Sequence, residues 1–281
     1  TMVRRIDDAI ADLIQLLKDL EIDERTLVVL TSDNGTLREG GLDNVGSYRP
    51  DYLDTFGRYD GTKLDLWEGG VRMPTIVRWP SVIKARSKSD LASQFHDWMA
   101  TFCDLSGVPV PAVSDGVSIV PTLTGKGEQA QGIVYTELLV RGRTQNYLEF
   151  EPSRRGRPHG QMQSVLIGDY KGIRVDVKGH RDVFEVYHTL KDPKETTNLA
   201  GQSEAPTQKQ FQAAVLRSRR IDPLSKRPYD NALIPPVTGI ATRPGLVRKE
   251  FPGPFDWVPQ FGNRTPSGRK IVKGLAVTTA A

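Results

Sequence analysis

The sequence predicts an α/β fold with a mainly parallel sheet, followed by a small antiparallel-sheet subdomain. Apolar residues at helical spacing fill residues 1–20, and a short apolar run at 27–30 has the pattern of a buried strand. Helix, short connection and buried strand, in this order, form half of a βαβ repeat, which favours a parallel sheet. Beyond residue 130, short β-branched and aromatic runs with turn residues between them favour antiparallel strands.

Length and composition are those of an ordinary globular protein. The 281 residues are 38% hydrophobic and 26% charged, and no apolar run approaches the ~18 residues of a membrane span. No nucleic-acid-binding motif is present. A single cysteine, Cys103, excludes an internal disulfide and leaves the compartment open. Because the sequence starts at Thr1 within a helical pattern, we expect it to be the C-terminal part of a longer chain.

The net charge of +4 is unevenly distributed. Residues 216–281 contain 12 Lys or Arg against 4 Asp or Glu. Such a basic tail suits either an anionic partner or a solvated surface. Proline-rich stretches in the same region, IPPV and FPGPFDWVP, disfavour regular helix or strand there.

The first helix is expected over residues 1–20, with its apolar residues on one stripe. The apolar strand at 27–30 then runs through Thr31 and Ser32 into Asp33-Asn34-Gly35. Ligands bind at the carboxyl ends of strands in open α/β sheets, and neighbouring Asp and Asn side chains offer oxygen ligands for a hard cation. A plain turn is the alternative interpretation of this triplet.

Residues 36–60 lack periodicity and predict a long loop directly after the strand, a position typical of functional loops. The segment 61–74, GTKLDLWEGGVRMP, contains paired glycines for close packing or a tight turn, and another strand is expected at 75–79. We expect Glu68 and Arg72 to hold this turn by charge pairing rather than to act as an acid/base pair. Trp67 and Trp79 are expected in the core.

A set of motifs, in order over residues 5–200, resembles the type I, formylglycine-dependent sulfatases of the alkaline phosphatase superfamily. They are TSDNG, a lysine five residues before EGG, EGGVRMP, a strand ending in WP, DWMATFCDLSGVP, DGVSIVPTLTG, YTE, GDYK and EVYHTLKDPKETTNLA. The resemblance implies that residues 1–130 are the C-terminal part of the catalytic α/β core of a sandwich fold. It also implies a subdomain of antiparallel sheet and helix at 131–220. The proline-rich, basic residues 221–281 are expected to form an extended tail.

The resemblance further implies a sulfuric ester hydrolase of arylsulfatase type. Asp33 and Asn34 match the residues that bind a divalent cation, Ca²⁺ rather than Mg²⁺, and Lys63 matches the lysine that contacts the sulfate during catalysis. The family nucleophile, a formylglycine made in a Cys/Ser-x-Pro-x-Arg motif, belongs to an upstream half that this sequence does not contain. The implied partners are that upstream half and a sulfate ester, either a small molecule or a sulfated glycan.

Three alternatives remain open. The chain is a non-catalytic, truncated sulfatase-like binding protein, or a phosphate or phosphonate ester hydrolase of the same superfamily, or a shared scaffold whose 36–60 loop serves another binding function. Asn34 argues against the second, because those hydrolases more often carry Asp-His-Gly at this strand end. Substrate choice is expected to depend on the loops at 36–60 and 141–162.

Several other residues are expected to be structural. Phe150-Glu151-Pro152-Ser153-Arg154 imitates the nucleophile motif, but phenylalanine cannot be oxidised to an aldehyde, so we interpret it as loop. Cys103 lies in an apolar helix expected at 91–105 and is interpreted as a buried thiol. The four histidines lack metal-binding spacing, and only His159, in an expected loop, is considered for a pocket.

Overall fold

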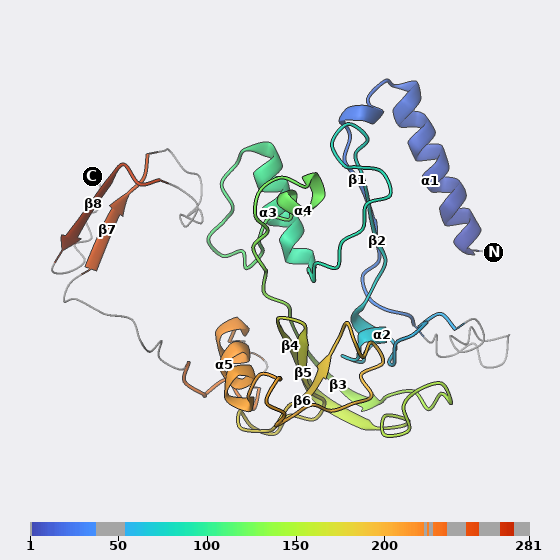
Figure 1. The fold of residues 1–281 in the computed structure, drawn as a ribbon, viewed down its shortest axis with the longest axis vertical. Coiled ribbons are helices and arrows are strands. Elements are labelled where there is room, and N and C mark those ends of the chain that lie inside the picture. The colour runs from blue at the N-terminus through green and yellow to red at the C-terminus, as the bar shows by residue number, and fades with distance from the viewer. Residues whose placement is uncertain are drawn as a thin grey trace. The chain divides into compact units, whose positions relative to one another are not determined.

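The computed structural model describes residues 2–37, 54–221, 224, 227–234, 246–252 and 265–272. The chain forms two compact units. One contains Thr1–Ser89 and Ile133–Ile234, and the other contains Asp90–Gly132 and Pro235–Ala281. Helices and antiparallel sheets alternate along the chain, which confirms the α/β class (Figure 1). The three-part division at residues 130 and 220 stays a prediction.

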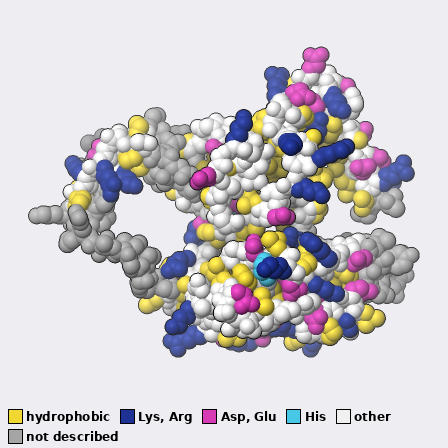
Figure 2. Space-filling model, viewed as in Figure 1, with side chains coloured by type: hydrophobic (Ala, Val, Ile, Leu, Met, Phe, Trp, Pro, Cys, Tyr) yellow, Lys and Arg dark blue, Asp and Glu magenta, His cyan; other side chains and the backbone are white. Residues whose placement is uncertain are grey.

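The first unit begins with helix α1 (Met2–Asp19), as the sequence predicts, and a 3₁₀ turn η1 (Asp23–Arg25). The apolar stripe of α1 is largely open to solvent: Val3 is 78% exposed and Leu13 61%. An amphipathic helix of this kind ordinarily gains its stability by covering that stripe. Figure 2 shows hydrophobic side chains reaching the surface among the charged ones.

Strands β1 (Val28–Thr31) and β2 (Thr75–Arg78) pair antiparallel, from Val28 opposite Arg78 to Thr31 opposite Thr75. The prediction of a mainly parallel sheet is therefore wrong for this pair, and the described residues contain no parallel pair. The reason is the connection between the strands. Among its described residues, 32–37 and 54–74, the connection contains only the short helix α2 (Glu68–Val71) and no helix long enough for a parallel crossover.

The second sheet is a four-stranded antiparallel meander, as predicted. It consists of β3 (Tyr135–Arg143), β4 (Pro158–Ile167), β5 (Tyr170–Arg174) and β6 (Glu185–His188), in that order. β3 and β4 form a long hairpin, with Tyr135 opposite Val165 and Arg143 opposite Pro158. The expected loop at 141–162 is therefore shorter, because strand pairing continues on both sides of it.

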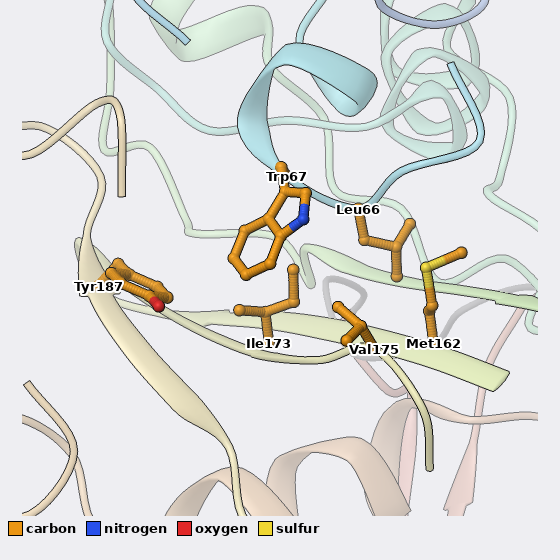
Figure 3. Packing of buried hydrophobic residues seen from close by; sticks show 6 residues of the cluster. All are labelled: Leu66, Trp67, Met162, Ile173, Val175 and Tyr187. Atoms are coloured by element: carbon orange, nitrogen blue, oxygen red, sulfur yellow. The ribbon is translucent and has the colours of Figure 1, made fainter. Parts of the chain in front are cut away.

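Alternating side chains of this sheet enter two separate cores, because successive residues of a strand point to opposite faces. On one face, Met162, Ile173 and Val175 pack with Tyr187 against Leu66 and Trp67 (Figure 3). Trp67 is fully buried and meets Tyr187 edge-on at 6.0 Å between ring centroids. The sheet thus supports the segment that carries Lys63, and the prediction that Trp67 is a core residue is confirmed.

On the opposite face lies helix α5 (Gln208–Ser218), which begins with a capping box formed by Thr207 and Gln210. Phe211 and Val215 of this helix pack with Val165 and Val186. A Cβ added at Gly172 would lie only 2.5 Å from the Phe211 ring, so glycine allows the helix to approach the sheet this closely. The predicted helix packed on an antiparallel sheet is confirmed.

The second unit contains helices α3 (Phe95–Ser106) and α4 (Val120–Thr124) and strands β7 (Leu246–Glu250) and β8 (Gly268–Val272). Cys103 is buried on α3, as predicted. β7 and β8 pair antiparallel, so the expectation that the tail lacks regular structure is wrong for these two strands; they are rich in branched and long side chains and lie between the proline-rich stretches. None of the described helices has the length and apolarity needed to cross a membrane.

Candidate functional site

The tip of β1 carries Asp33 and Asn34 side by side. Asp33 is exposed and Asn34 half-buried, and the Asn34 amide donates a hydrogen bond to the Asp33 carboxylate (3.0 Å). One carboxylate and one amide are oxygen donors that suit a hard cation. They fit part of a calcium shell only, and no group of three or more His, Cys, Asp or Glu side chains within the described residues is arranged to hold a metal.

Glycines join this tip to the segment that follows the 36–60 loop. The Gly35 amide donates to the Gly70 carbonyl (2.9 Å). A Cβ at Gly35 would collide with the carbonyl oxygen of Gly69, and a Cβ at Gly70 would collide with the carbonyls of Thr62 and Asp65. The paired glycines are therefore required for close backbone packing, one of the two reasons that the sequence suggested for them.

The backbone of Lys63 is hydrogen-bonded to the segment that follows the tip of β1. Its amide donates to the Thr36 carbonyl (2.6 Å), two residues after Asn34. The adjacent Leu64 has a positive φ of 78°, an uncommon conformation for a residue with a side chain. The structure thus brings the backbones of all three sequence-predicted site residues into neighbouring segments, while their chemical roles stay predictions. Of the 36–60 loop itself, residues 38–53 lie outside the described residues.

Asp65 stabilises the turn that carries Lys63. Its amide donates to the Thr62 carbonyl (2.9 Å), and its carboxylate accepts from the Thr62 amide (3.1 Å) and the Thr144 hydroxyl (2.6 Å). Burial raises the pKa of Asp65, although these hydrogen bonds oppose the shift. His159 Nε2 lies 3.8 Å from the same carboxylate.

The expected position of His159 in a loop is wrong, since it lies within β4 and is only 8% exposed. The polar, glycine-rich sequence before residue 160 concealed the continuation of the strand. His159 does line a pocket, one of the two roles that its sequence position suggested. Asp65 was missed altogether, although its place two residues after Lys63 was a usable signal.

A buried charge cluster connects helix α2, which contains the paired glycines Gly69 and Gly70, to strand β5 of the sheet. Glu68 bonds to Arg72 and accepts from Lys171 (2.8 Å), and Lys171 also lies 3.1 Å from Glu195. Glu195 in turn accepts from the Glu68 amide (2.8 Å). The expected structural pairing of Glu68 and Arg72 is confirmed. Lys171 and Glu195, which sequence reasoning did not single out, lie in the GDYK and DPKETTNL motifs.

The pKa values in this charge cluster follow from burial and mutual attraction. Burial raises the pKa of Glu68, but Lys171 and Arg72 together hold it below its usual value. Burial lowers the pKa of Lys171, but Glu195 and Glu68 more than offset that effect and raise it. Burial keeps the pKa of Glu195 raised despite Lys171. The buried Lys171 ammonium therefore opposes the effect of burial on the pKa of both glutamates.

The imitation nucleophile motif is structural, as predicted. Phe150 is 1% exposed and packs with Phe56 and Tyr147. Arg154 is equally buried, lies 3.2 Å from the Asp60 carboxylate and stacks over the Trp67 ring at 4.0 Å. These contacts bind the 147–157 turns to the segment that leads to Lys63.

Comparisons with known proteins agree with the motifs. The family model described as Sulfatase matches residues 1–108, and the model described as N-sulphoglucosamine sulphohydrolase, C-terminal, matches residues 55–220. Human steryl-sulfatase is 34% identical over 130 residues, which are 46% of this chain and 22% of that protein. An N-acetylgalactosamine-6-O-sulfatase of Bacteroides thetaiotaomicron is 28% identical over 206 residues, 72% of this chain and 38% of that one.

A solved structure, described as a complex with its substrate D-glucosamine-2-N,6-O-disulfate, is also similar. It is 26% identical, with a TM-score of 0.51, and the match covers 76% of this chain and 38% of that one. The chain thus spans between about a fifth and two-fifths of the length of these relatives. From these matches and the site geometry, we conclude that the chain belongs to the sulfatase family of the alkaline phosphatase superfamily.

Proposed function

We propose that this chain is the C-terminal portion of a sulfuric ester hydrolase of arylsulfatase type, and that it supplies cation-binding and sulfate-binding side chains to the active site. The observation that carries the proposal is the hydrogen bond from the Lys63 amide to Thr36, beside the Gly35–Gly70 bond. Together these bonds join the TSDNG tip to the turn at residues 62–65, which we name the lysine turn. These are the two segments whose motifs match the family site.

Each residue has a chemical role in this proposal. Hydrolysis of a sulfate ester places negative charge on the equatorial and leaving oxygens. Asp33 and Asn34 would hold a calcium ion, and Lys63 would neutralise a sulfate oxygen; a cation and an ammonium at these positions would lower the energy of the charged transition state. The formylglycine hydrate, when present, supplies the oxygen that attacks sulfur as the alcohol leaves.

The upstream half of the sulfatase domain is the proposed protein partner. Two observations support it: the matches cover only 22–38% of these relatives, and the apolar stripe of α1 is open. Covering Val3, Ile6, Leu13 and Leu20 in a domain core would remove an apolar surface that an isolated helix does not bury.

The proposed substrate is a sulfate ester on a small molecule or a glycan. The D-glucosamine-2-N,6-O-disulfate bound by the structural neighbour supports a sulfated sugar as one candidate. The names of the curated relatives, steryl-sulfatase and N-acetylgalactosamine-6-O-sulfatase, give the range of alcohols to test.

The test measures turnover of an aryl sulfate by this chain joined to an upstream half that carries Cys/Ser-x-Pro-x-Arg. Lys63→Ala should reduce kcat/KM by more than about 100-fold, equivalent to ~2.7 kcal/mol of lost transition-state stabilisation. Lys84→Ala, which removes an exposed lysine elsewhere, is the control and should leave the rate unchanged.

Two other results would favour the alternatives. Faster turnover of a phosphonate ester than of the sulfate would identify a phosphonate hydrolase. Saccharide binding without turnover of either ester would identify a non-catalytic binding protein. An unchanged rate in Lys63→Ala would reject the assigned role of that lysine.

A further inference from the structure

A pocket of about 650 Å³ lies along the β3–β4 hairpin and includes residues of the turn at 227–228. Its charged and ionisable lining, which we name the cationic pocket, consists of Arg141, Arg143, His159, Asp176, Lys178 and Arg227. Four cationic side chains therefore face one carboxylate. The volume is within the ~300–1,000 Å³ of small-molecule sites.

The positive charge of the cationic pocket is only partly neutralised by the protein. Arg227 pairs with Glu137 and Asp230, and Lys178 pairs with Asp176 at 2.6 Å. Arg143, by contrast, donates to the neutral carbonyl of Gly156 (2.8 Å).

Arg141 is exposed, and neither it nor Arg143 forms an ion pair within the described part of the chain. Two guanidinium groups thus remain available for an oxyanion, which arginine binds in a bidentate manner.

A β-bulge shapes the wall of the cationic pocket. The β3–β4 register shifts between Leu139 and Gly142, so Val140 and Arg141 leave the regular ladder. Bulges redirect side chains and are common beside functional sites. The Val140 carbonyl bonds to His159 Nδ1 (2.8 Å).

Because a carbonyl only accepts hydrogen bonds, the Nδ1 atom of His159 carries the proton. In the neutral ring, Nε2 is then an acceptor. Nε2 is 3.8 Å from Asp65, too far for a hydrogen bond.

The same histidine connects the cationic pocket to the lysine turn. Asp65, which faces His159, closes the turn from Thr62 and lies two residues after Lys63. The pocket is therefore beside the segment that we assign to sulfate binding.

We propose that the cationic pocket binds a second anionic group, a sulfate or carboxylate, on a hydroxylated sugar ring of the substrate. Arg141 and Arg143 bind the oxyanion, and His159 Nε2 accepts a hydrogen bond from a ring hydroxyl. The lining residues Leu139, Pro158 and Val177 offer apolar contacts to the C–H face of the ring. The choice of a sulfated saccharide rests on the proposed function, whereas the anion binding itself does not.

Calorimetric titration of the 281-residue chain tests this proposal without requiring turnover. The probes are a uronate–glucosamine disaccharide with two sulfates, the same disaccharide without sulfates, and inorganic sulfate, all at one ionic strength. Arg141→Ala and Arg143→Ala should each weaken binding of the sulfated disaccharide by about tenfold or more. Arg181→Ala removes an exposed arginine outside the pocket and should change the Kd by less than about twofold.

The desulfated disaccharide and inorganic sulfate separate the sources of the anion. Equal loss of affinity for the desulfated disaccharide in Arg141→Ala would identify the carboxylate as the bound group, and loss only for the sulfated form would identify the sulfate. Lys63→Ala should retain pocket binding, so failure of the sulfatase proposal would leave this result intact. Unchanged binding in both pocket variants, or an equal loss in Arg181→Ala, would overturn the proposal.

Discussion

Replacement of Lys171 by methionine tests the buried charge cluster behind the lysine turn. Lys171 is 2% exposed and lies 2.8 Å from the Glu68 carboxylate and 3.1 Å from that of Glu195. Methionine keeps most of the side-chain volume, so little stability is lost through changed packing. The variant leaves two buried carboxylates without their shared ammonium, which costs about 3–5 kcal/mol in comparable buried pairs.

The matched control is Lys178→Met. Its ion pair with Asp176 is as close, at 2.6 Å, but the two side chains are 75% and 50% exposed. Water screens such a pair, and its removal should cost less than about 1 kcal/mol. Urea unfolding at pH 7 measures both variants, and the m-value establishes that they unfold from equally compact states.

The pH dependence gives a second readout of the same pair of variants. In the parent protein the lowered pKa of Glu68 stabilises the fold above the ordinary glutamate pKa, and this stability is lost as pH falls through the folded value. Without Lys171, the pKa of Glu68 rises and the already raised pKa of Glu195 rises further, so both glutamates bind protons more readily in the folded state. The cost of Lys171→Met should therefore be smaller at pH 5 than at pH 8. A cost equal to that of Lys178→Met, or one independent of pH, would refute this reasoning.

Three further predictions concern the site and its support. Calcium at a hundredfold excess over its Kd should stabilise the protein joined to its upstream half by about 2.7 kcal/mol, and Asp33→Ala should abolish the calcium-dependent rise in Tm; an unchanged rise would reject the metal assignment. Gly70→Ala should lower the free energy of unfolding in urea by about 2–3 kcal/mol, because its Cβ collides with the Thr62 and Asp65 carbonyls. The control Gly179→Ala, whose nearest contact is at 3.8 Å, should be nearly neutral. Equal losses in both variants would contradict the importance of close packing at Gly70. Thr207→Ala should cost about 1 kcal/mol by removing the cap of α5, against no change in Ser203→Ala, and a neutral Thr207→Ala would show that the cap contributes nothing.

Local patterns predicted most of the individual elements. Helix α1 was predicted from the helical spacing of its apolar residues. Strands β5 and β6 were predicted from short runs of β-branched and aromatic residues. Strand pairing is different, because the direction of β2 relative to β1 depends on the path of the whole 32–74 connection. The described ends of this connection meet in close backbone contacts such as Gly35 with Gly69, which no local periodicity records.

The candidate site residues were predicted from motifs. The buried residues that hold the site in place were not predicted. Asp33, Asn34 and Lys63 are recognisable in the sequence because they lie in short, dense motifs. Lys171 and Glu195 meet Glu68 from positions more than 100 residues away, so their pairing appears only when the sheet is folded. His159 escaped correct placement because its strand continues through Pro158 and Gly160, residues that usually indicate a loop.

The central claim is that Asp33, Asn34 and Lys63 act on one sulfate group. A crystal structure of this chain with its upstream half, calcium and inorganic sulfate tests it most directly. We predict calcium ~2.3–2.6 Å from oxygens of Asp33 and Asn34, with Lys63 Nζ about 3 Å from a sulfate that also contacts the ion. Calcium bound away from Asp33, or a sulfate that Lys63 does not reach, would contradict the account.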